Sequence, residues 1–351
     1  MVGGGLIATA FSDGVRRVAA APALAVGVFA MTLVLALPLT FTMRGLIEAH
    51  LGRSLAAGSA ADDVNPDWWQ EFTAQASGLG TTFTPSVIGF AATLDTVSSV
   101  ADGTPPVMAI RGAIGAYLLG WLILSGGILD RYARQRPTRV PGFFAACGVF
   151  FFRFLRLGIV AGIVYGFLFT YVHQWMFDRW YTWATRDVAV ERTALLWRFG
   201  IYGLFAAFVA AANVVFDYAK IRAVVEDRRS MLGALSASLG FILRHPRRVL
   251  GLYALNTVAF LVVAATWAVA SPRAGGMGLS MWAGLLAGQI YVLARLLLKL
   301  QFLASQAALF QRSLAHASYV AAPVPVWPES PMAELISQVP GPASSPHPRE
   351  R

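Results

Sequence analysis

Six long apolar runs separated by polar segments form the main pattern along this chain. A transmembrane helix needs roughly 20 apolar residues, because each residue rises 1.5 Å across a hydrocarbon core about 30 Å thick. All six runs meet this length. They cover residues 21–43, 107–129, 150–172, 194–216, 249–270 and 280–303. The pattern predicts an all-α, polytopic membrane protein with six transmembrane helices.

The composition is that of a membrane protein, and the positions of the basic residues explain the positive net charge. The chain is 57% hydrophobic and 13% charged, whereas soluble domains carry about a quarter charged residues. Its formal net charge of +10 would suit nucleic acid, but the basic residues gather at the ends of the apolar runs. They are Arg16 and Arg17, then Arg131, Arg134, Arg136 and Arg139, then the segment 220–248. We therefore expect no nucleic-acid partner and instead contact with anionic membrane lipids.

The basic segments alternate with acidic or balanced ones, and this alternation predicts orientation. The segment 44–106 lies between two basic segments and has an excess of acidic residues. The positive-inside rule then places the basic segments and both termini in the cytoplasm. Lysine occurs only at Lys220 and Lys299, beside many arginines and alanines. This usage suggests a GC-rich bacterial genome and hence a bacterial inner membrane.

Two stretches of the chain repeat the same arrangement. When Pro22 is superimposed on Pro246, Ala10 meets Ala234 and apolar residues recur at spacings of three and four. Each stretch therefore reads as an amphipathic interfacial helix, a proline break and a transmembrane helix. A third copy over 142–172 has Arg153 in place of the proline. Here a separate interfacial helix and one long tilted helix both remain open.

The repeat predicts three units of an interfacial helix and a transmembrane hairpin. Unit 1 covers 1–130 and includes the long outer loop 44–106, unit 2 covers 131–220, and unit 3 covers 221–316. The remaining residues, 317–351, are rich in proline and are expected to form a disordered cytoplasmic tail.

Two stretches resemble a known group of proteins. "GGILDRYAR" followed by "GFFAACGVFFFRFLRL", and "FDYAKIRAVVEDRRSMLGAL", are similar to bacterial six-span integral membrane proteins without an assigned activity. The general plan also resembles the membrane domain attached to some glycerophosphodiester phosphodiesterases. The resemblance implies a fold and no reaction, since the catalytic domain of those phosphodiesterases is absent from this sequence.

Enzyme motifs are missing from the sequence. The five histidines are scattered, the single cysteine is Cys147, and no pair of ligands has the spacing of a metal site. The GxSxG, HExxH and P-loop patterns are also absent. We therefore expect a non-enzymatic protein without a cofactor or metal.

Polar residues at membrane depth are the remaining candidates for function, because they are costly in hydrocarbon. In one interpretation, these residues line a central pathway or a pocket for a lipid headgroup. In the other, Asp130 pairs with Arg134 and Asp217 with Lys220, while the arginines near residue 155 reach lipid phosphates. The candidates are Asp130, Arg134, Arg153, Arg156, Asn213, Asp217, Lys220, Asn256, Lys299 and Gln301.

Aromatic residues on the outer side form a second group of candidates. The segment "NPDWWQEF" predicts a helix that begins after Asn65, with Pro66 in its first turn. The side chains of Trp68, Trp69, Trp175 and Trp180 would lie at the outer membrane surface. They form either an interface for a lipid or a partner, or an ordinary aromatic belt.

These patterns favour a membrane scaffold or accessory subunit that binds lipid or a membrane-protein partner, with a homo-oligomer also open. The alternative is a permease for a small or amphiphilic solute, whose pathway would run between the three units. The absence of a central Asp or Glu in the spans argues against ion-coupled transport.

Overall fold

A computed structural model describes residues 2–55, 57–62, 65–83, 98–99, 101–104, 106–271 and 279–316. Within these residues the secondary structure is helical, with no strand. The expected tail, 317–351, and residues 84–97 of the long outer loop lie outside the described residues.

Six of the helical segments are long and apolar enough to cross a membrane, which confirms the predicted class of an all-α, multi-pass membrane protein. Most of them extend beyond the apolar runs at their polar ends. They are α2 (Pro22–Leu51), α6 (Met108–Arg134), a segment over Val140–Thr185 that begins with α7, α9 (Glu191–Val225), α11 (Pro246–Ala270) and α12 (Leu279–His316).

The helix that begins at Val140 resolves the open question about the third interfacial helix. It passes Arg153 and Arg156 without a break, so no separate interfacial helix exists there. Arginine can continue a helix, whereas the prolines at the other two joins cannot donate the hydrogen bond that would continue one. α7 (Val140–Phe167) then continues through two wide π-helical segments, Leu168–Val172 and Trp175–Tyr181, and ends in α8 (Thr182–Thr185).

Two short amphipathic helices precede α2 and α11. α1 covers Val2–Ala19 and α10 covers Met231–Arg244. Pro22 and Pro246 are the first residues of the helices that follow, where the missing N–H has no helical partner to lose. Ser230 caps α10 by accepting a hydrogen bond from the backbone N–H of Gly233 at 3.2 Å. The two predicted breaks at proline are thus confirmed.

Each short helix packs mainly on a span other than the one that directly follows it. α1 packs along α12, α10 packs along α9, and the start of α7 packs along α6. Gly14 makes the first of these contacts possible, because a Cβ there would lie 2.9 Å from the Cα of Ser305. Gly127 does the same for α6, since its Cβ would lie 2.6 Å from the Phe143 ring. We call the end of the spans that holds α1, α10 and the 135–139 connection the basic end.

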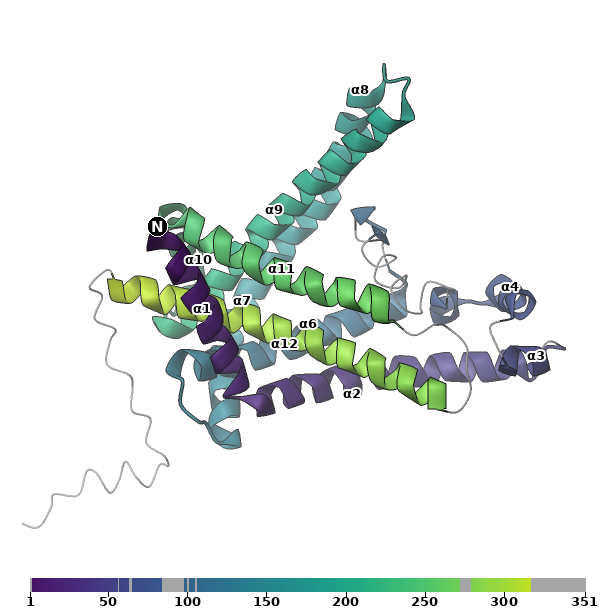
Figure 1. The fold of residues 1–351 in the computed structure, drawn as a ribbon, viewed down its shortest axis with the longest axis horizontal. Coiled ribbons are helices and arrows are strands. Elements are labelled where there is room, and N and C mark those ends of the chain that lie inside the picture. Colours follow the sequence, from purple (N-terminus) through teal and green to yellow (C-terminus); the bar gives the residue numbers. More distant parts are fainter. Residues whose placement is uncertain are drawn as a thin grey trace, which may run out of the picture.

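A single large core lies at the basic end and joins all the long helices. Away from it, the hairpin formed by the Val140–Thr185 segment and α9 diverges from the other spans, and its tip at α8 stands clear of them (Figure 1). The outer half of this hairpin has a small core of its own around Met176, Ile201 and Phe205. The long helices therefore meet at the basic end, and the hairpin of the Val140–Thr185 segment and α9 separates from the others at its outer half (Figure 1).

The described part of the outer loop packs on the ends of two spans. Asn65 caps α4 (Pro66–Gln75) as predicted, because its side chain accepts hydrogen bonds from the N–H groups of Asp67 and Trp68. Two shorter helices, α3 (Ala57–Asp62) and the 3-10 helix Gly78–Thr82, flank α4. Further along, the His173 Nε2 lies 2.6 Å from the carbonyl oxygen of Ala101, which ties the end of the loop to the diverging hairpin.

The division into three repeat units stays a prediction. Two pairs of residues that the superposition matched have similar surroundings. Ala10 and Ala234 are both fully buried. Gly14 and Ser238 both face the span that their short helix crosses, with Ser238 Oγ donating to the Val215 carbonyl at 3.3 Å.

Candidate functional site

Polar side chains from several spans gather near the centre of the molecule, where α6, α9, α11 and α12 approach one another. α9 contributes an ion pair, with 2.7 Å between the Lys220 Nζ and the Asp217 carboxylate. One turn away on α9, the Asn213 amide donates to the Tyr253 hydroxyl of α11 at 3.2 Å. We call Asn213, Asp217, Lys220 and Tyr253, together with Lys299, the polar cluster.

Lys299 extends the polar cluster to α12 and α6. Its Nζ lies 3.8 Å from the centre of the Trp121 ring and 5.0 Å from that of Tyr117, so the ammonium group rests on two aromatic faces. Lys220 and Asp217 are close enough to act on its charge. Lys299 makes no ion pair with any residue that the structure describes. Among the described residues, its ammonium group is therefore in direct contact with the two aromatic rings.

The other predicted polar residues do not join this cluster. The pairing of Asp130 with Arg134 is confirmed at 2.7 Å, and so is the pairing of Asp217 with Lys220. Arg153 binds the Asp227 carboxylate at 2.5 Å, so it meets a protein carboxylate before any lipid phosphate. Arg156 is exposed on α7.

Asn256 and Gln301 serve helix packing. Asn256 is fully buried, and its amide donates to the Ser305 hydroxyl at 3.0 Å. The Gln301 amide donates to the backbone carbonyl of Phe11 at 2.9 Å, which fixes α1 on α12. Both side chains hold helices together through bonds that would be costly to leave unmade in hydrocarbon.

The predicted outer tryptophans divide into two groups. Trp68 is buried against Phe72, with 5.4 Å between their ring centres, and Trp69 donates to the Phe83 carbonyl at 3.3 Å. Trp68 thus belongs to the packing of the outer loop, and its side chain is not offered to a membrane or partner. Trp175 and Trp180 lie on the diverging hairpin, stacked with 5.9 Å between ring centres.

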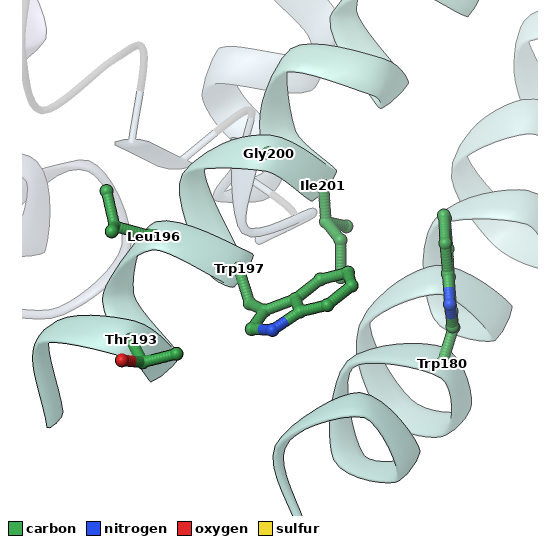
Figure 2. A pocket seen from close by; sticks show the side chains of 6 residues that line it. All are labelled: Trp180, Thr193, Leu196, Trp197, Gly200 and Ile201. Atoms are coloured by element: carbon green, nitrogen blue, oxygen red, sulfur yellow. The ribbon is translucent and has the colours of Figure 1, made fainter. Parts of the chain in front are cut away.

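Two shallow apolar depressions border these hairpin tryptophans. One, of about 400 Å³, is lined by Trp180, Trp197 and Ile201, with the Trp197 ring directed toward the helix that carries Trp180 (Figure 2). The other, of similar size, is lined by Phe167, Tyr171, Trp175 and Phe208. We call the aromatic residues around both depressions the hairpin flank; they are Phe167, Tyr171, Trp175 and Trp197, which are exposed, and Trp180, which is half-buried.

Sequence reasoning missed the aromatic residues that complete both regions. Trp121, Tyr117 and Tyr253 lie within apolar runs, where such residues usually serve the core, and only the packing brings them to Lys299 and Asn213. Trp197 likewise lies in an apolar run. Its spacing from Trp180 carries no signal, because the two residues lie on different helices.

In the part of the chain that the structure describes, no group of three His, Cys, Asp or Glu side chains could hold a metal ion. No protein-family model matches the chain, and neither a curated protein nor a solved structure matches it. The fold defines the class of an all-helical, multi-pass membrane protein.

Proposed function

We propose that this protein is a non-enzymatic membrane scaffold or accessory subunit that binds lipid or a membrane-protein partner. Its proposed location is a bacterial inner membrane, with both termini in the cytoplasm. The observation that carries the proposal is the diverging hairpin with its exposed aromatic flank. Trp175 is 55% exposed and Tyr171 65% exposed beside an apolar depression.

The hairpin flank has the features of an interaction surface. Its exposed residues are aromatic and border two shallow depressions, and Trp and Tyr are enriched where binding energy is concentrated. The flank lies away from the main core, so an occupant can reach it without rearranging the bundle. The core at the basic end then anchors the projecting hairpin.

Site-specific photocrosslinking tests this proposal. A benzophenone amino acid replaces Trp175 on the hairpin flank, and the matched control replaces Val34, which is 63% exposed on α2. We expect position 175 to give discrete adducts in native membranes, with one protein or one lipid class enriched over position 34. Identical, diffuse lipid adducts at both positions would contradict a docking role for the flank.

A second variant separates the scaffold from a permease. The triple change of Asp130→Asn, Asp217→Asn and Asn213→Ala removes polar groups that a solute pathway would use. For a scaffold we expect the adducts at position 175 to persist in a folded triple variant. Solute uptake into proteoliposomes by the unaltered protein, abolished in the triple variant, would instead establish a permease.

A further inference from the structure

The strongest unexplained feature in the membrane-spanning part is a set of cations on one face of α12. Arg295 and Lys299 are four residues apart, so they lie one above the other on the same side of the helix. Both are exposed, and neither forms an ion pair with a described residue. Each rests instead on an aromatic ring, Arg295 at 5.5 Å from the centre of Tyr291 and Lys299 at 3.8 Å from that of Trp121.

The balance of charge around Lys299 is positive. Lys220 and Arg295 act on it as neighbouring cations, and Asp217 as a neighbouring anion. The Asp217 carboxylate already binds Lys220 at 2.7 Å. One carboxylate thus faces three cations, Lys220, Arg295 and Lys299, and a net positive charge without an added anion is costly at membrane depth.

These cations lie within reach of a phospholipid headgroup. Lys299 lies four residues before the end of the apolar run 280–303, about 6 Å at 1.5 Å per residue. A lysine side chain is long enough to extend its ammonium group over that distance toward the headgroups of the leaflet at the basic end. Arg295 lies about 6 Å deeper on the same scale.

The surroundings can hold a phosphate and acyl chains together. Tyr253 accepts the Asn213 amide, so its own hydroxyl hydrogen is available to an anionic oxygen. Next to Trp121, α6 exposes Ile114, Leu118 and Leu119 toward the hydrocarbon. A free phosphate makes no apolar contact with these residues, whereas the acyl chains of a lipid would bury them.

We propose that the face formed by Arg295 and Lys299 of α12, with Tyr117 and Trp121 of α6, binds the phosphate of an anionic phospholipid from the leaflet at the basic end. Lys299 supplies the main charge, and Lys220 and Tyr253 complete the polar side. This deepens the proposed function, because it rests on the lipid-binding role and names the lipid class and its residues.

Lipid binding to the purified full chain tests this site. Native mass spectrometry in a mild detergent compares phosphatidylglycerol, phosphatidylcholine and inorganic phosphate as probes. We expect phosphatidylglycerol to bind several-fold more tightly than phosphatidylcholine, whose choline cation offsets the phosphate. Equal binding of the two lipids would overturn the proposal, and so would displacement of phosphatidylglycerol by equimolar inorganic phosphate.

Variants assign the binding to Lys299. We expect Lys299→Gln to weaken phosphatidylglycerol binding about tenfold, the loss of one charge-assisted hydrogen bond, and Lys299→Arg to preserve it. Arg247→Gln is the matched control, since Arg247 is an exposed cation at the basic end outside the cluster. Unchanged binding in Lys299→Gln would overturn the assignment. If that variant does not fold, Arg295→Gln replaces it with the same expectation.

This test fails separately from that of the proposed function. If lipid selectivity is lost but the adducts at position 175 persist, only the proposed lipid site on α12 is ruled out. Loss of the adducts at position 175 with selective phosphatidylglycerol binding removes only the docking role of the hairpin flank.

Discussion

Charged residues in this protein differ by whether their partner is near in sequence or distant. Asp130 and Asp217 meet a basic residue four or three positions later on the same helix, a spacing that helical geometry makes foreseeable. Asp13 combines both cases, because Arg16 lies three residues away on α1 whereas Arg312 lies on α12. Its side chain is 13% exposed.

The Asp13 carboxyl is outside the spans and yields a prediction for pH dependence. Burial by itself raises its pKa, but hydrogen bonds and charge from Arg312 and Arg16 outweigh burial and lower the pKa below the ordinary value. A lowered pKa in the folded state stabilises the fold above the unfolded value, about 3.9, and this contribution is lost as pH falls through the folded value.

We therefore expect Asp13→Asn to reduce the free energy of unfolding by about 1 kcal/mol at pH 7, a modest figure because both arginines are partly exposed to solvent. Thermal unfolding of the purified protein in detergent measures the difference. The gap between the two proteins should stay constant from pH 7 to pH 5 and shrink below about pH 4. A gap that widens below pH 4 would contradict this role for Asp13.

At the scale of elements, close helix contacts decide where the short amphipathic helices lie. α1 and α10 look alike in sequence, but α1 packs along α12, which is distant in the chain, whereas α10 packs along α9, the span directly before it. The contact of α1 with α12 depends on the absence of a side chain at Gly14. A Cβ atom there would lie 2.9 Å from a backbone atom, the Cα of Ser305. A backbone atom cannot relieve the overlap by a change of rotamer, as a flexible side chain could.

Gly14→Ala tests this contact. We expect a loss of about 1–3 kcal/mol from overpacking, with weaker protection of the α1 amides in hydrogen exchange. The matched control is Gly240→Ala in α10, where a Cβ would meet nothing within 4 Å. Alanine favours a helix over glycine by about 1 kcal/mol, so this control should be neutral or stabilising. Equal destabilisation by both changes would rule out the close contact as the cause.

At the scale of the whole molecule, all the spans meet in one core at the basic end, and the hairpin of the Val140–Thr185 segment and α9 diverges from the other spans toward the other end (Figure 1). The core fixes which loops share a side of the membrane. The 135–139 connection shares its end with α1 and α10, whereas the turn between α8 and α9 lies at the hairpin tip. Only two orientations in the membrane are then possible, and by the positive-inside rule we expect the basic end to face the cytoplasm.

Cysteine labelling tests this orientation. Cys147 is buried between α6 and α7, so Cys147→Ala gives a cysteine-free background. We expect a membrane-impermeant maleimide to label Asp187→Cys in intact spheroplasts, and Arg136→Cys only after the membrane is opened. The reverse labelling pattern would place both termini outside the cytoplasm.

The sequence alone determined the features that depend on local spacing. Run length and composition predicted the six spans, Pro22 and Pro246 predicted two breaks, and neighbouring charges predicted the ion pairs of Asp130 and Asp217. The third join stayed open, because an arginine neither forbids nor requires a bend, and only the structure showed a continuous helix there.

Only the tertiary structure decided what depends on residues distant in the chain. The aromatic rings around Lys299 come from α6, and the hydrogen bond from Gln301 to Phe11 joins α12 to α1. The divergence of the hairpin likewise follows from how six similar apolar helices share one core. Apolar periodicity shows that a helix face is buried, but every span offers nearly the same apolar surface. The choice of neighbour therefore rests on close packing and a few hydrogen bonds, which no local pattern records.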